Sequence, residues 1–133
     1  MAHTHLSICL HLENGGRIGP GKIALLEAIQ TKGSIKAAAR HLGMSSRRTW
    51  LLIQQVNDAL QQRAVSTQQG GWQNSAVVTP VAERVIGLYR SIENLTRTAA
   101  FQELQELARL TRRGPPDRKK RSARAAGGPS CVA

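Results

Sequence analysis

The chain has 133 residues, 41% of them hydrophobic and only 3% aromatic, and its formal net charge is +11. This length suits one domain with tails, and a core of Leu, Ile, Val and Ala favours packed helices over a β-sandwich. The charge favours a polyanionic partner, and no apolar run is long enough for a membrane span.

The positive charge is unevenly distributed. Residues 112–124 contain seven Lys and Arg against one Asp, a net charge of +6, so +5 of the total +11 is left for the rest of the chain. The Pro, Gly, Arg and Lys composition predicts that residues 112–133 are a basic disordered tail.

The first elements in chain order are a strand and a helix. Hydrophobic residues alternate with polar ones over residues 6–13, which predicts a strand with one buried face, and a turn follows at residues 14–16. A helix is expected to begin at Pro20, with an apolar stripe that includes Ile23, Leu26 and Ile29. Gly33 is placed to end it in a left-handed conformation.

Two further helices follow closely. Ser34 is a good N-cap for a short helix to about Leu42, Gly43 breaks that helix, and Ser45 caps a third helix over residues 45–60. The spacing puts one set of side chains on the inner side of this third helix and another on the outer side. The inner set is Trp50, Ile53, Val56 and Leu60, and the outer set is Arg47, Leu51, Gln55 and Asp58.

This pair of helices has the pattern of a helix-turn-helix. Small side chains at Ala38 and Ala39 would let two helices cross at short range, and Gly43 accepts the positive φ that the turn requires. The third helix then presents Arg47 and Arg48 near its exposed N-terminus, where a recognition helix reaches base edges. The alternative is an ordinary alanine-rich helix with its C-cap.

The next segment predicts a hairpin and a long helix. Two β-prone pieces around Val65 and Val77 flank a Gly-Gly centre, and Thr79-Pro80 then begins a helix expected over residues 80–111. Its apolar residues recur at intervals of four and three, which favours a dimer seam over packing on its own domain. This stripe is Val81, Val85, Leu88, Ile92, Leu95 and Ala99, and its phase slips after Ala99.

The predicted fold is therefore mainly α with a small β wing. We expect a winged helix-turn-helix DNA-binding domain with an N-terminal strand over residues 1–79, a long dimerisation helix over residues 80–111, and the basic tail over residues 112–133.

These motifs resemble a known family. The segment "GRIGPGKIALLEAIQTKGSIKAAARHLGMSSRRTWLLIQQVN", followed by "GG" and "VVTPVAERVIGLYRSIE", is similar to the N-terminal domain of the bacterial ModE molybdate-responsive transcription regulators, over roughly residues 5–98. It is similar more distantly to the helix-turn-helix of LysR-type regulators. The resemblance implies a winged helix-turn-helix that dimerises through its long helix and binds a two-fold operator in double-stranded DNA.

The expected DNA-binding residues lie on the two short helices and in the wing. Ser46 stands where the family usually has a bulky aromatic residue, Thr49 replaces a small apolar one, and the wing segment at residues 70–74 has no cation. The full set is Ser34, Lys36, Ser45, Ser46, Arg47, Arg48, Leu51, Gln55, Gly71 and Trp72.

The family's molybdate-binding domains have no counterpart among these residues, so we expect no molybdate on this chain and no cofactor. His3, His5, Cys9 and His11 would share a strand face, but a plain edge strand is commoner than a metal site there. Cys9 and Cys131 are better explained as reduced thiols than as a disulfide.

A regulator is the preferred function class. No carboxylate pair, nucleophile–base arrangement or phosphate loop predicts an enzyme, and scarce aromatics argue against RNA. We expect a bacterial cytoplasmic, nucleoid-associated protein, because the N-terminus lacks a signal-peptide pattern. The alternative is a dimerising protein-interaction adaptor that pairs with a full-length regulator and binds DNA weakly or non-specifically.

Overall fold

The computed structural model describes residues 4–67 and 75–112. A short antiparallel hairpin, β1 (Leu10–His11) with β2 (Arg17–Ile18), precedes three helices: α1 (Pro20–Lys32), α2 (Ile35–Leu42) and α3 (Ser46–Ala59). A second antiparallel hairpin of β3 (Val65–Thr67) and β4 (Ala76–Val78) leads into α4 (Pro80–Ala99) and α5 (Phe101–Leu110). The mainly helical fold with a small β wing is confirmed.

The wing hairpin is bound to the helices at its base. Val65 pairs with Val78 and Thr67 with Ala76, so Val65, Ala76 and Val78 turn inward while Val77 stays exposed. The amide of Ala76 also donates to the carbonyl of Gly33 at 2.9 Å, and Ser34 forms a β-bridge with Ser75. The junction between α1 and α2 therefore acts as a one-residue third strand.

The expected strand over residues 6–13 is much shorter in the structure. Leu6, Ile8, Leu10 and Leu12 are half-buried, as the alternation predicted, but only Leu10 and His11 pair with a second strand. The partner strand is equally short: between the turn and the start of α1 at Pro20, only Arg17 and Ile18 pair with β1.

The inner face predicted for the third helix is confirmed at Ile53, Val56 and the half-buried Leu60 and is wrong at Trp50. The buried side chains of α3 are Thr49, Leu52, Ile53 and Val56, whereas Trp50 is 38% exposed. Thr49 can enter the core because its hydroxyl donates to the carbonyl of Ser45 at 2.7 Å.

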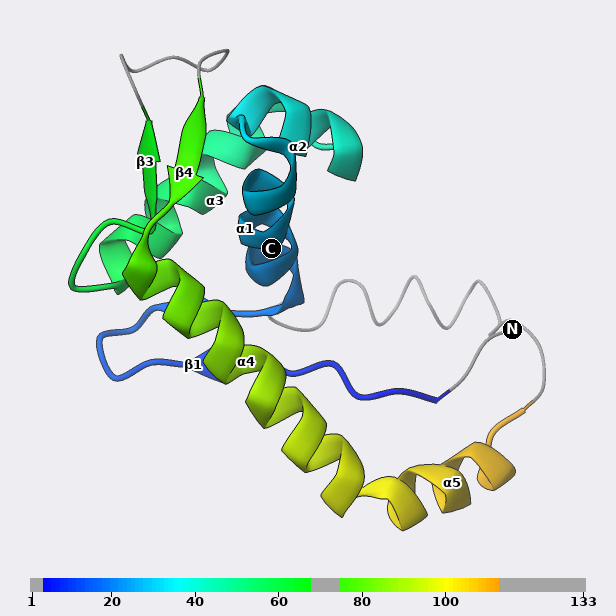
Figure 1. Ribbon diagram of the computed structural model, residues 1–133. Helices are drawn as coiled ribbons and strands as arrows, with labels where there is room; N and C mark the ends of the chain where they lie inside the picture. Colours follow the sequence, from blue (N-terminus) through cyan, green and yellow to red (C-terminus); the bar gives the residue numbers. More distant parts are fainter. Residues whose placement is uncertain (1–3, 68–74, 113–133) are drawn as a thin grey trace.

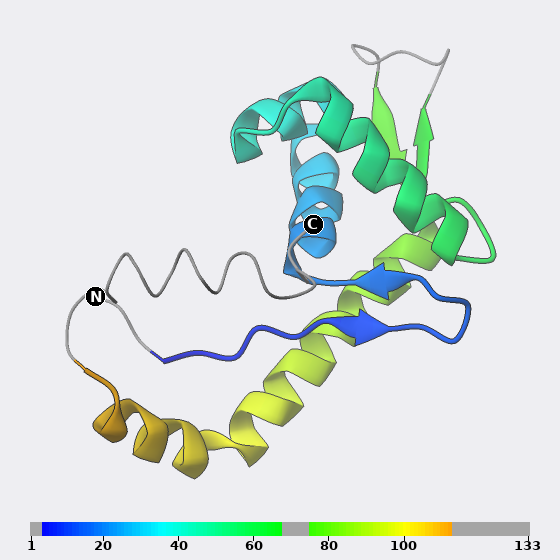
Figure 2. The same ribbon diagram turned by 180° about the vertical axis from the view of Figure 1, so that it is seen from behind.

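The single helix expected over residues 80–111 is two helices. The chain breaks at Ala100, whose ψ of 13° leaves the helical range, and α5 turns away from α4 (Figure 1). This is the point at which the apolar phase slips in the sequence. The N-terminal hairpin lies alongside α4 in both views (Figures 1 and 2).

One core holds these elements together. It contains Ile23, Ile29 and Ile35, each 0% exposed, with Tyr89 of α4 packed against them at 1%. Within the described ranges, no helix combines the length and hydropathy needed to cross a membrane.

The glycine in the turn between α2 and α3 is required by its backbone conformation. Gly43 has a φ of +67°, and a Cβ built there would meet nothing within 4 Å, so strain is the only cost of a side chain. We expect Gly43→Ala to lower the free energy of unfolding by about 1 kcal/mol in urea titrations.

Gly87 is the matched control. It lies inside α4 without a positive φ, and a Cβ there also meets nothing within 4 Å. Gly87→Ala should raise the free energy of unfolding by roughly 0.5–1 kcal/mol through helix propensity. Changes of the same sign in the two variants would contradict the role given to Gly43.

Candidate nucleic-acid interface

The interface is built on a short, tightly packed helix, α2. Gly33 ends α1 with a φ of +77°, and the hydroxyl of Ser34 then accepts from the amide of Ala37 at 3.0 Å, which caps α2. Ala38 and Ala39 are 0% and 2% exposed, because they face the neighbouring helices without any longer side chain to hold them apart. The two alanines are thus buried, as a close approach of α2 to its neighbours requires.

The turn that follows directs α3 outward. The amides of Gly43 and Met44 donate to the carbonyls of Arg40 and Ala39, at 3.2 and 2.9 Å, and satisfy the end of α2. Ser45 then caps α3 by accepting from the amide of Arg48 at 3.2 Å. These local bonds set the place at which α3 begins.

The first turn of α3 is open to solvent. Ser46, Arg47 and Arg48 are exposed, and neither arginine forms an ion pair in the part of the chain that the structure describes. Further along the same helix, Leu51 is 53% exposed and Gln55 is exposed. The predicted residues of α3 therefore share one accessible surface.

The charge of this region is uniformly positive. Residues 28–57 contain five Lys and Arg and no Asp or Glu, a net charge of +5. Neither α2 nor α3 has an acidic residue in its first turn, so the positive ends of both helix dipoles add to the charge. Such a surface attracts a polyanion.

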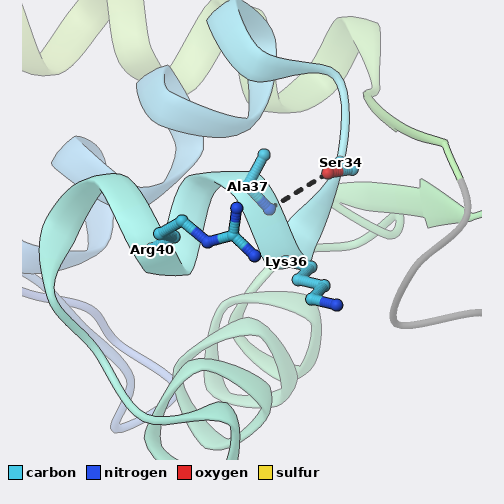
Figure 3. A pocket seen from close by; sticks show the side chains of 4 residues that line it. All are labelled: Ser34, Lys36, Ala37 and Arg40. Carbon is cyan, nitrogen blue, oxygen red and sulfur yellow. Dashed lines mark hydrogen bonds between the residues drawn. The ribbon is translucent and has the colours of Figure 1, made fainter.

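A hollow of about 230 Å³ lies beside the start of α2 and is lined by Ser34, Lys36, Ala37 and Arg40 (Figure 3). The side chain of Arg40 runs toward the amino end of the helix, while Lys36 points outward. Arg40 was not among the expected DNA-binding residues. Its spacing of four from Lys36 could have identified it, because residues four apart share a helix face.

A second hollow, of about 370 Å³, lies between the turn that joins β1 to β2 and the C-terminal half of α3. Its lining includes Lys22, whose ammonium donates to the carbonyl of Arg17 at 2.8 Å. Burial, reinforced by the charge of Arg17, lowers the pKa of Lys22. Asp58 lines the same hollow, so its charges are mixed, unlike those of the first.

Some of the expected site residues lie elsewhere or cannot be placed. Gly71 and Trp72, like the basic tail beyond Arg112, fall outside the described residues. His3, of the metal set considered above, does too, and residues 4–67 and 75–112 hold no group of three potential metal ligands.

The stripe of the long helix is divided between two environments. Val81, Val85 and Ile92 are half-buried against their own chain, whereas Leu88 is 46% exposed, Leu95 is 69% exposed and Ala99 is exposed. The residues that α4 buries fully in its own domain are Ala82, Ile86 and Tyr89. None of the side chains of α5 is buried.

The chain is similar to curated regulators and binding proteins of molybdenum metabolism, although no family model matches it. It is 41% identical over 80 residues to the molybdenum-pterin-binding protein MopB of Rhodobacter capsulatus, which covers 59% of this chain and 30% of that protein. It is 29% identical over 107 residues to the transcriptional regulator ModE of Haemophilus influenzae, covering 80% of this chain and 42% of ModE.

A third relative is the molybdenum transport protein ModE of Azotobacter vinelandii, 31% identical over 98 residues, with 73% of this chain and 36% of that protein covered. The chain thus spans between 30% and 42% of the length of these relatives. The similarity supports a relationship to the ModE regulators, and none of the three bears the name of an enzyme.

Proposed function

We propose that this chain is a ModE-like transcription regulator that binds a two-fold operator in double-stranded DNA as a homodimer. The observation that carries the proposal is the exposed, cationic first turn of α3. This turn follows α2, which packs into the domain through the buried Ala38 and Ala39. We place it in the bacterial cytoplasm, associated with the nucleoid.

The first turn of α3 supplies the base contacts in this proposal. Arg47 and Arg48 carry planar guanidinium groups that can pair with two acceptors of a guanine in the major groove. Further along the helix, Leu51 offers apolar contact to a thymine methyl group, and Gln55 can pair with adenine. The hydroxyl of Ser46 is exposed and can contact a base or a phosphate.

The start of α2 supplies phosphate contacts. Ser34 and Ser45 keep a free hydroxyl proton after capping their helices, and Lys36 and Arg40 flank the hollow beside α2. These contacts position the protein on the duplex without reading its sequence. Gly71 and Trp72, which lie outside the described residues, complete the proposed set.

The dimer would form through the exposed part of α4. Leu88, Leu95 and Ala99 lie at intervals of seven and four along the helix, and a second copy would cover them around a two-fold axis. α5 also exposes apolar side chains, at Phe101, Leu107 and Leu110. Two-fold symmetry would present two recognition helices to successive major grooves.

The proposal assigns neither molybdate nor a pterin to this chain. A small oxyanion requires several donors that converge on one enclosed point. The exposed cations of α2 and α3 are instead spread along two helices.

The second candidate is the dimerising protein-interaction adaptor. The observation that favours it is the apolar surface of α5, which DNA binding does not use. In that case the affinity for DNA would come from the basic tail, and α3 would read no sequence.

Replacing Arg47 and Arg48 together by alanine distinguishes the two candidates. If α3 is the recognition helix, the double variant loses its contacts to guanine and phosphate. Its binding to a selected operator should then weaken by roughly 10- to 100-fold in fluorescence-anisotropy titrations. The matched control is Arg84→Ala with Arg97→Ala on α4, which removes the same charge from another element. Equal affinities for the operator in the two double variants would favour the adaptor.

Leu95→Glu tests the dimer. The carboxylate would be buried unpaired in the seam, so we expect the variant to be largely monomeric at micromolar concentration in light scattering coupled to size exclusion. Val77→Glu, at a side chain of β4 that is 59% exposed, is the control and should remain dimeric. A dimeric Leu95→Glu variant would remove α4 from the interface.

Deleting residues 112–133 tests the tail. The deletion removes a net charge of +6, so we expect weaker binding to operator and random duplexes alike and a shallower dependence on salt. The ratio of the two affinities should stay unchanged. A loss of that ratio would mean that the tail contributes to sequence recognition.

A further inference from the structure

Two neighbouring residues of α4 attach it to the rest of the domain by directed bonds. The hydroxyl of Tyr89 donates to the carbonyl of Ile8 at 2.6 Å, and the guanidinium of Arg90 binds both carboxylate oxygens of Glu27 on α1. The Nε–Oε2 distance is 3.1 Å and the Nη2–Oε1 distance 2.5 Å. A third bond joins Arg90 Nη1 to Glu93 at 2.8 Å.

These bonds lie where α4 leaves the domain. The residues of α4 before them, Ala82 and Ile86, are buried in the core, whereas residues 94–99 are exposed. Figures 1 and 2 show the second half of α4 extending away from the recognition helix and the wing. Arg90 is therefore among the last contacts between the DNA-binding part of the chain and Leu95 and Ala99, the two exposed seam residues that lie beyond it on α4.

The Arg90 contact matters more for the orientation of α4 relative to α1 than for the free energy of folding. Arg90 and Glu27 are 43% and 37% exposed, and exposed ion pairs contribute little to folding. A planar guanidinium bound through two parallel bonds nevertheless fixes the relative orientation of its two helices. Hydrogen bonds to Glu27 and Glu93 raise the pKa of Arg90.

We propose that the Glu27–Arg90 pair is a positioning contact that sets the separation of the two recognition helices, and so the spacing of operator half-sites that the dimer accepts. The inference rests on the proposed function, because it requires a dimer joined through α4. Glu27 on α1 and Arg90 on α4 would then influence DNA specificity although neither belongs to the proposed DNA-binding residues.

The lever is long enough to matter. At about 1.5 Å per residue, Leu95 and Ala99 lie about 8 and 14 Å beyond Arg90 along the helix axis. A tilt of α4 by about 15° at Arg90 would shift Leu95 and Ala99 by about 2–4 Å relative to the DNA-binding part of the same chain. This shift is comparable with the roughly 3.4 Å rise of one base pair. Because the proposed dimer is two-fold symmetric, the shifts in the two copies add, and both change the distance between the two recognition helices.

The test is a series of operators whose half-sites are moved apart or together by one and two base pairs, titrated by anisotropy together with a single half-site. The wild type should bind one spacing best and lose about tenfold in affinity for a change of one base pair. In Arg90→Gln and Glu27→Gln we expect this penalty to fall to about threefold or less, with affinity for the half-site unchanged.

Two further variants separate positioning from charge. Arg97→Ala removes a cation of α4 that contacts only Asn94 of the same helix among the described residues, and it should keep the wild-type profile. Exchanging the pair, as Glu27→Arg with Arg90→Glu and with Glu93→Gln to avoid repulsion, should restore a sharp optimum.

The outcomes distinguish this inference from the proposed function. A wild-type protein that is monomeric, or that binds all duplexes equally, overturns the proposed function and this inference with it. A dimeric wild type with one sharp optimum that Arg90→Gln and Glu27→Gln both retain overturns only the positioning role.

Discussion

The close contact of α2 with its neighbours is the constraint on which the rest of the structure depends. Ala38 and Ala39 are almost completely buried, so the distance between α2 and the helices around it is set by methyl groups. A larger side chain at either position would push α2 outward and carry α3 with it, because only Gly43, Met44 and Ser45 separate the two helices. The direction of the cationic end of α3 thus follows from a packing distance.

Positive charge and exposed apolar side chains are concentrated in different parts of the chain. The acid-free stretch of residues 28–57 spans the end of α1, all of α2 and most of α3, while five of the eight large exposed hydrophobic side chains among the described residues lie on α4 and α5. The other three, Trp50, Leu51 and Val77, lie on α3 and β4. The figures show the wing and the N-terminal end of α3 at one end of the molecule and α5 at the other (Figures 1 and 2). In the proposed function, the polyanion and the second copy would therefore occupy different parts of the chain, and α4 would connect them.

The elements that could be predicted from sequence are those whose ends are set by local chemistry. Gly33 and Gly43 have the positive φ expected of helix C-caps, and Ser34 and Ser45 accept the expected amide bonds, because each motif is complete within a few residues. In α3 the inner positions Ile53 and Val56 were predicted correctly and Trp50 was not, because packing places Thr49 in the core in its stead. The bend at Ala100 was visible only as a slip in phase.

The order of elements, the caps, the exposed arginines at the start of α3 and the excess of positive charge all follow from residue type and short-range spacing, so the amino-acid sequence is enough to predict them. Contacts between distant residues depend instead on how the helices pack. The bond of Tyr89 to Ile8 joins residues 81 positions apart and the pair of Arg90 with Glu27 joins residues 63 apart. The partners at these separations are chosen by how the helices pack around one core, and no local pattern encodes that choice.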